Sequence, residues 1–287
     1  MTLIDRGSWQ DVHDLAQRLL PSSVAQRWLD TVRQVVHLVP AGPGEPVLAT
    51  LGGSPHLPRH GLLARTRWPT WRGSGPLSFV GELDLEALAE SGLQTGLTLP
   101  GSGRLLMFFF DGSYDDFESL VEPSDPRSQA GARLLHLPEP RSACTPLAAP
   151  KRVRVDPEVA LTGRQCLSLP DPDAPGAAAL ADSVDLQTLD ELYTTLETWA
   201  VRPPRHQIGG WPSGIQTPPE LEAAVFATGC LDWDDPTVVQ DATQRRLLIQ
   251  IDSTPTSPWG DAGTLYWLAP GTDASNPTSA TFTWQSA

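Results

Sequence analysis

The first forty residues carry an apolar pattern that changes from helical to strand spacing. Between residues 12 and 19 apolar side chains recur every three or four positions, which predicts a helix with Ser8 or Asp11 as its cap. A second helix is expected from Ser22. The run 35–39 then changes to mostly β-branched residues, so we expect a strand to follow the two helices.

Further along, short apolar runs predict strands rather than helices. Residues 77–83 alternate between apolar and polar positions, which is typical of a strand buried on one face. Residues 105–110 are apolar throughout and predict a strand covered on both faces. A short turn of helix is expected at 85–88, and further strands at 132–137 and 165–169.

Prolines interrupt the middle of the chain. They recur through residues 138–184 and keep breaking regular patterns, so we interpret this region as the connection between two halves. Asp185 is then a good cap for a helix that reaches about Trp199, with leucines along one face.

One order of motifs occurs twice. A Gly-Gly turn followed by a proline precedes an apolar strand that ends near an acidic residue, and then a strand introduced by glycine. The first copy comprises 51–55, 77–85 and 103–110, and the second comprises 208–212, 246–252 and 263–268. Two such units would each expose an apolar face and would pair to bury it.

The predicted fold class is therefore α+β. We expect two tandem copies of a mainly antiparallel β unit packed together, with N-terminal helices and a central helix. The expected parts are 1–40 (N-terminal helices and first strand), 41–137 (first repeat unit), 138–184 (connecting region) and 185–287 (helix and second repeat unit). Together they would form one compact domain.

Charge and composition narrow the classes of partner. The formal charge is −14, which disfavours nucleic acid and anionic membrane surfaces as partners. No apolar run approaches the length of a membrane span, and the first residues lack a secretion signal, so we expect a cytoplasmic protein. Neither Gly-Gly motif has the spacing of a nucleotide-binding loop, and no cofactor is predicted.

The ordered motifs resemble those of the YwqG-like family, a bacterial domain of unknown function. The segments that carry the resemblance are Leu51–Pro58, Trp68–Pro69, Pro76–Leu85, Leu99–Phe110, His206–Gln216, Leu247–Asp252 and Trp259–Tyr266. The resemblance implies a cytoplasmic bacterial protein with a duplicated α+β fold and no established reaction.

Four carboxylates are candidates for chemistry. Glu82 and Asp84 are two apart on a predicted strand and therefore face the same side, and Asp252 occupies the comparable place in the second copy. If the copies face each other, these groups would form an acid and base pair like that of a glycosidase. Asp261 lies in the turn 259–263, where flanking glycines leave it accessible or where it simply accepts backbone hydrogen bonds.

Aromatic residues in turns suggest a binding surface instead. Trp68, Trp71, Trp211 and Trp259 all lie beside glycine or proline, and His206 directly precedes the second Gly-Gly motif. The alternative is that the tryptophans fill the joint between the two copies. The acidic run 111–122 resembles a calcium loop but lacks its glycine and its preceding helix, so no metal is predicted.

These observations favour a non-enzymatic binding or interaction protein, with an immunity or regulatory role and a basic protein or peptide as its partner. The alternative is a carboxylate-dependent hydrolase acting on a carbohydrate, which would use Asp261 together with Glu82, Asp84 or Asp252. The oligomeric state is not predicted.

Overall fold

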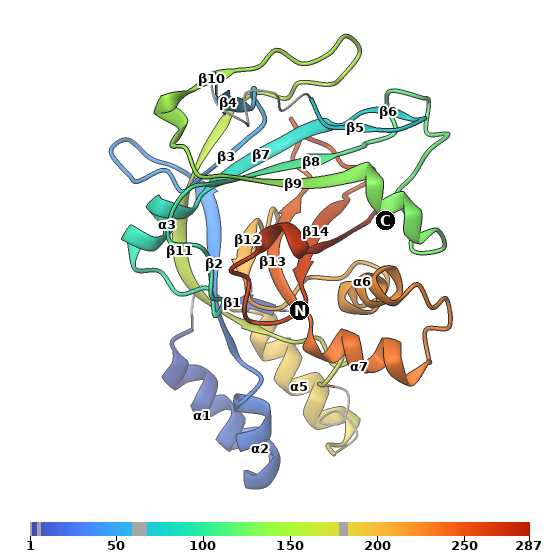
Figure 1. The fold of residues 1–287 in the computed structure, drawn as a ribbon. Coiled ribbons are helices and arrows are strands. Elements are labelled where there is room, and N and C mark those ends of the chain that lie inside the picture. Colours follow the sequence, from blue (N-terminus) through green and yellow to red (C-terminus); the bar gives the residue numbers. More distant parts are fainter. Residues whose placement is uncertain (1, 5–6, 59–67, 178–182) are drawn as a thin grey trace.

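The computed structural model describes residues 2–4, 7–58, 68–177 and 183–287. Its main feature is an 11-stranded sheet in which every strand pair is antiparallel, with helices packed against its outer side (Figure 1). The predicted mixture of helices and antiparallel strands is confirmed.

The sheet is arranged symmetrically about two long central strands. From one edge to the other the strands are β15 (Thr281–Gln285), β14 (Thr264–Ala269), β13 (Arg246–Asp252), β12 (Gln207–Gly209), β2 (Arg33–Pro40), β11 (Val159–Leu169), β3 (Ala49–Leu51), β7 (Ser78–Asp84), β8 (Arg104–Phe109) and β9 (Ala132–Leu137). The short strand β1 (Thr2–Ile4) pairs with the far end of β11. Four strands thus lie on each side of the central pair.

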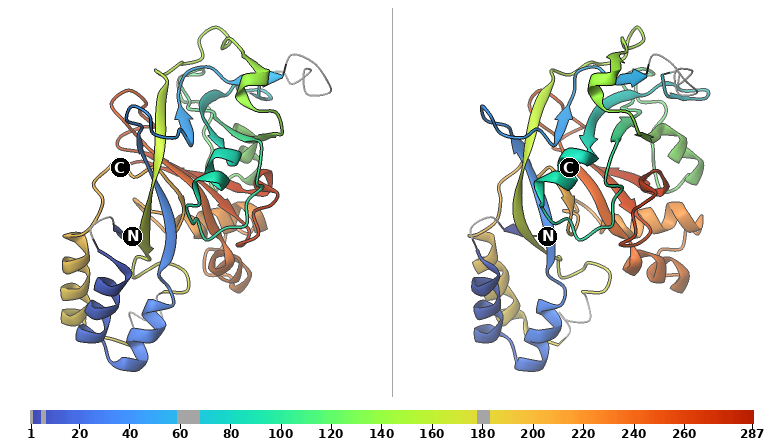
Figure 2. Two further views of the ribbon diagram at one scale, coloured as in Figure 1. Left: turned by 90° about the vertical axis from the view of Figure 1, so that its left-hand side faces the viewer. Right: turned by 60° about the vertical axis from the view of Figure 1, so that its left-hand side comes forward.

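The sheet curls until its two edges approach each other (Figure 2). The gap is bridged by Gln129, which lies in the 3-10 helix η2 (Pro126–Gly131) just before β9. Its amide nitrogen donates to the carbonyl of Phe282 in β15 at 2.6 Å, and its amide oxygen accepts from the Phe282 N–H at 3.1 Å. One side chain therefore takes the place of a neighbouring strand at this edge.

We expect Gln129→Ala to lower the free energy of unfolding by about 2 kcal/mol, because two edge hydrogen bonds of about 1 kcal/mol each are lost. Urea unfolding measures this loss. The matched control is Gln240→Ala, which removes an exposed amide on a helix and should change stability by less than about 0.5 kcal/mol. Equal effects of the two substitutions would contradict the role of Gln129 in closing the sheet.

Side chains from all the long strands meet inside the curled sheet. This main core includes Val36, Leu83, Met107, Trp267 and Phe282. The strand predicted at 105–110 is buried throughout, as expected.

The strand predicted at 77–83 is present as β7, but the expected burial is wrong, because β7 is buried on both faces rather than one. Phe79 lies in a second cluster on the outer side, with Phe108 and the partly buried Trp68 and Trp71. Two small sheets accompany the outer side of the first half, β4 (His56–Pro58) with β10 (Cys144–Pro146), and β5 (Thr70–Trp71) with β6 (Gly75–Pro76).

The predicted N-terminal and central helices are confirmed and pack together as one lobe. They are α1 (Trp9–Leu19), α2 (Ser22–Leu29) and α5 (Leu186–Glu197), and Figure 1 shows them below the central strands. Of the two expected caps for α1, Ser8 is the cap and Asp11 completes its capping box. Asp185 caps α5 by accepting from the Thr188 N–H at 3.0 Å.

Two helices that the sequence pattern did not predict cover the outer side of the second half. They are α6 (Pro219–Thr228) and α7 (Pro236–Gln244). The residues of α6 are buried around most of its circumference, so its sequence has almost no amphipathic pattern. Proline at its start and Gly229 at its end were the available signals.

The remaining short elements complete the chain. They are α3 (Leu85–Ser91) after β7, where a short helical turn was predicted, and the 3-10 helices η3 (Arg141–Ala143) and η4 (Pro277–Ser279). The region 138–184 contributes β10 and the whole of β11, which starts at Val159 instead of near residue 165 as predicted. Residues 178–182 of that region lie outside the described residues.

Both Gly-Gly motifs have left-handed backbone at both glycines, with φ between 66° and 76°. The reason is clearest at Gly209, where a Cβ atom would lie 2.0 Å from the carbonyl oxygen of Thr95. The second motif thus lets the 95–98 segment pack directly against the end of β12. The same segment is also held by backbone hydrogen bonds from Thr98 to Thr272 and from Ala274 to Thr98.

Candidate functional site

A pocket of about 350 Å³ opens on the outer face of β3, β7 and β11. It is lined by Val47, Leu48, Ala49, Thr50, Glu82, Asp84, Arg141, Glu158 and Ala160. We refer to it as the Glu82 pocket. Its position follows from strand register, because Thr50 lies opposite Glu82 across β3 and β7, and opposite Ala160 across β3 and β11.

Glu82 and Asp84 reach this pocket together, as their spacing predicts. They are alternate residues of β7 and project to the same face, while Leu83 between them enters the main core. At about 3.4 Å per residue their Cα atoms are about 7 Å apart. The sequence-based expectation that these two carboxylates share a side is met.

Glu82 is paired with two guanidinium groups. Its Oε2 accepts from Nη1 of the buried Arg104 at 2.6 Å, and its Oε1 lies 3.4 Å from Nε of Arg141. Arg104 also donates to the carbonyls of Glu139 and His56, at 3.0 and 2.9 Å. The charge of Glu82 is therefore compensated below the pocket floor, where an unpaired charge would be costly.

Asp84 and Glu158 hold the other two negative charges. Asp84 accepts from the N–H of Ala87 at 3.0 Å and so caps α3, and Glu158 pairs with Nη2 of Arg141 at 2.5 Å. Among the described residues, three carboxylates thus face the two guanidiniums of Arg104 and Arg141, which leaves a formal excess of one negative charge. The wall formed by residues 47–49 and 160 is apolar.

Asp252 does not converge with Glu82 and Asp84, as the glycosidase-like arrangement would require. It lies in β13, which is separated from β7 by the four strands β12, β2, β11 and β3. Its carboxylate accepts from the N–H of Arg205 at 2.7 Å and from Gln250 at 2.9 Å. It belongs to a packed polar cluster in the second half.

His206 belongs to the same packed cluster. It is buried, and its Nδ1 accepts from the N–H of Asp252 at 3.2 Å. Burial lowers the pKa of His206 to about 4, and the nearby Asp252 carboxylate only partly offsets that effect. The imidazole is therefore neutral at pH 7 and serves as a hydrogen-bond acceptor.

Asp261 and Trp259 lie in the turn that leads into β14. Asp261 is exposed, and its backbone carbonyl accepts from the N–H of Ala287 at 2.9 Å. Trp259 is 2 % exposed and packs on Phe109 in the main core. Of the two alternatives for this tryptophan, the contacts favour core packing.

The other predicted aromatic residues are also packed. Trp68 donates from its indole nitrogen to the Leu77 carbonyl at 2.6 Å, and Trp71 stacks edge-on against Phe110. Trp211 is 5 % exposed and donates to the Thr31 carbonyl at 2.8 Å. The predicted aromatic binding face is thus not formed by exposed rings at Trp211 or Trp259.

Sequence reasoning missed the charged residues that surround Glu82. Arg104, Arg141 and Glu158 are 22 to 76 positions away from it along the chain, and single basic or acidic residues at such distances carry no motif. They are brought together by the pairing of β7 with β8, of β4 with β10 and of β3 with β11.

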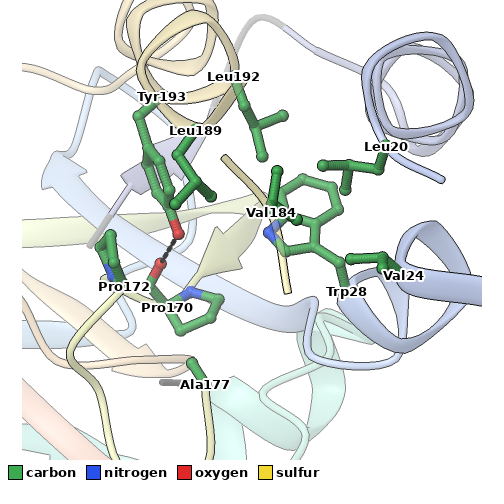
Figure 3. A pocket seen from close by; sticks show the side chains of 10 residues that line it. All are labelled: Leu20, Val24, Trp28, Pro170, Pro172, Ala177, Val184, Leu189, Leu192 and Tyr193. Carbon is green, nitrogen blue, oxygen red and sulfur yellow. Dashed lines mark hydrogen bonds between the residues drawn. The ribbon is translucent and has the colours of Figure 1, made fainter. Parts of the chain in front are cut away.

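A separate, apolar crevice lies in the helical lobe (Figure 3). Residues of α2 and α5, including Trp28 and Leu192, face the prolines at 170 and 172 across it. The hydroxyl of Tyr193 lies in the crevice and donates to the Pro170 carbonyl at 3.3 Å. Burial raises the pKa of Tyr193 to about 12, so this hydroxyl stays protonated.

The fold and this geometry define a class of protein, an α+β domain built on a curled antiparallel sheet with a charged pocket on its outer face. The chain belongs to the family described as "Domain of unknown function (DUF1963)", whose model matches residues 49–285. That match runs from the start of β3 to the end of β15. No curated protein matches the chain.

Helix length and composition bear on membrane association. Within the described ranges, no helix combines the length and apolar character that crossing a membrane would require. The same part of the chain contains no group of three or more His, Cys, Asp or Glu side chains suited to holding a metal ion.

Proposed function

We propose that this protein binds a basic side chain of a protein or peptide in the Glu82 pocket and catalyses no reaction there. The observation that supports the proposal is the balance of charge at the pocket. Three carboxylates line it beside an apolar wall, against the guanidinium of Arg141 in the lining and that of Arg104 below the floor. We also propose a cytoplasmic location and a regulatory or immunity role, in keeping with the likeness to the YwqG-like family.

The apolar wall suits the stem of a long basic side chain. Lysine and arginine carry three or four methylene groups between backbone and charge, and these groups pack on apolar surface while the charged end stays near polar groups. Val47 is 43 % exposed at the wall of the pocket, and Ala49 and Ala160 lie close by. Asp84 and Glu158 are placed to receive the charged end.

The net negative charge of the whole chain also favours a basic partner. At −14 the molecule attracts cationic partners over distances of about a Debye length, which raises their rate of association at low salt. The local excess of negative charge in the pocket then selects where a cationic group comes to rest.

The test uses a fluorescent heptapeptide rich in arginine and lysine, with a glutamate-rich peptide of equal length for comparison. We expect the basic peptide to bind at low salt, and Glu158→Gln to weaken binding about tenfold, because one of the carboxylates that receives the charged end is lost. Fluorescence anisotropy measures the dissociation constants.

Glu197→Gln is the matched control, since it removes the same charge from an exposed position on α5. This variant should change affinity less than twofold. If the two variants weaken binding equally, the peptide senses only the overall charge, and the proposed pocket is wrong.

A carbohydrate hydrolase is the second candidate function, because Glu82 and Asp84 line one pocket. The contacts favour binding over catalysis, since Glu82 is paired with two arginines and Asp84 caps a helix. Release of reducing sugar from a panel of oligosaccharides, lost in Asp84→Asn, would favour the hydrolase over the binding protein.

We further propose that the two halves are tandem copies of one β unit. Two observations support this proposal. Thr50, two residues before Gly52, pairs with Glu82, just as Gln207, two residues before Gly209, pairs with Gln250. The strand register also shifts at the same place in both units, between Phe79 and Gly81 and between Leu247 and Ile249.

A further inference from the structure

A second pocket, of about 250 Å³, lies at the end of the curled sheet where β2 and β13 begin. Its lining includes Arg33, Gln34, Gly96, Arg246 and Thr272. The loop that closes it is the 95–98 segment, which packs on Gly209 and pairs with residues 272–274. Figure 2 shows this segment after α3 passing beside the segment that follows β14.

Among the described residues of this lining, the only charged ones are two arginines, in a chain whose formal charge is −14. Arg33 stacks on Trp211, with its guanidinium carbon 3.2 Å from the ring centroid, and donates through Nη1 to the Gly210 carbonyl at 3.2 Å. Arg246 donates through Nη1 to the carbonyls of Thr243 and Arg245, at 3.0 and 2.7 Å.

Within the part of the chain that the structure describes, neither guanidinium forms a salt bridge. Glu220 in α6 attracts both arginines without reaching ion-pair distance of either. Burial and the neighbouring charge of Arg246 lower the pKa of Arg33 to about 9, so Arg33 is cationic at pH 7. The two like charges are therefore only partly compensated by Glu220, and an anion bound between them would stabilise the protein.

Neutral donors complete the lining. Thr272 contributes a hydroxyl to the lining, and Gly96, whose φ is 71°, contributes its backbone. The amide oxygen of Gln34 accepts from Gln165 at 2.9 Å, which leaves the amide nitrogen of Gln34 as a donor. Guanidinium, hydroxyl and amide donors together are the groups that bind phosphate and carboxylate oxygens.

We propose that this pocket is a binding site for a small oxyanion, a phosphate or carboxylate group held between Arg33 and Arg246. The site is independent of the Glu82 pocket, from which it differs in charge and in the strands that build it. Arg33 and Gln34 lie before residue 49, outside the part of the chain that the family model matches.

Calorimetric titration with inorganic phosphate at constant ionic strength tests the proposal. We expect wild type to bind one phosphate per chain, and Arg246→Gln to weaken binding at least tenfold. Arg133→Gln removes an exposed positive charge from β9 and should change affinity less than twofold. Titration with succinate separates a preference for phosphate from a preference for carboxylate.

Arg33→Lys provides a second variant, because it keeps the charge and loses the planar stacking and forked geometry. We expect it to weaken phosphate binding severalfold while the far-ultraviolet circular dichroism stays unchanged. Two results would overturn the proposal. One is saturable binding of equal affinity in wild type, Arg246→Gln and Arg33→Lys. The other is no binding of phosphate or succinate up to about 10 mM, since weak binding sites have dissociation constants on the order of millimolar.

Discussion

Replacing Glu82 by glutamine is expected to lower the free energy of unfolding by about 3–5 kcal/mol, which is large for a single substitution. The reason is the position of its partner. Arg104 is 1 % exposed, so losing the carboxylate at 2.6 Å leaves a buried guanidinium without its closest counter-ion. Urea unfolding followed by tryptophan fluorescence measures the loss.

The double variant Glu82→Leu, Arg104→Met separates the pair from the surrounding packing. Removing both charges together leaves no buried ion unpaired, so we expect most of the lost stability to return. If the double variant is as unstable as Glu82→Gln, the cost lies in the shape of the site and the ion-pair explanation is wrong.

The sequence predicts elements well where one face is polar and the end is marked. Helices α1 and α5 have an apolar stripe and a side-chain cap, at Ser8 and Asp185, and both were predicted close to their observed bounds. Polar residues on their solvent-facing side alternate with the apolar stripe, so the helical spacing can be recognised in the sequence.

Prediction fails where both faces are covered. Strand β7 was expected to be half buried because polar residues such as Glu82 alternate with apolar ones. In the structure its outer face is buried as well, and Glu82 on that face pairs with Arg104. Helix α6 was missed for the same reason, since even its acidic residues Glu220 and Glu222 are buried. Polarity in the sequence indicates solvent only when no other buried group pairs with it.

The candidate sites were predicted only in part. The spacing of Glu82 and Asp84 placed both in one pocket, because alternation along a strand is a local property. The arginines at 33 and 246 are brought together by the pairing of β12 with both β2 and β13, which no local pattern encodes. A site assembled from distant strands becomes visible only when the sheet order is known.

The last prediction concerns Glu220, for which Glu220→Gln is expected to raise the free energy of unfolding by about 3 kcal/mol at pH 8 and by less than about 1 kcal/mol at pH 5. Glu220 is buried, and its Oε1 has no hydrogen-bond partner among the described residues. Burial raises its pKa from 4.5 to about 7. Below pH 4.5 the carboxyl is protonated in both the folded and the unfolded state, and the free energy of unfolding is not reduced. As the pH rises through 7 the buried carboxyl ionises and that free energy falls, whereas glutamine never ionises.

Urea unfolding at both pH values measures the difference, with Glu197→Gln as the exposed control that should change neither value. An equal effect of Glu220→Gln at pH 5 and pH 8 would show that ionisation of this group is not the cause. The same variant also affects the pocket between Arg33 and Arg246, because Glu220 offsets the charges of these two arginines when it ionises. With glutamine in its place, phosphate should therefore bind more tightly at pH 8, while binding of the basic peptide at the Glu82 pocket stays the same.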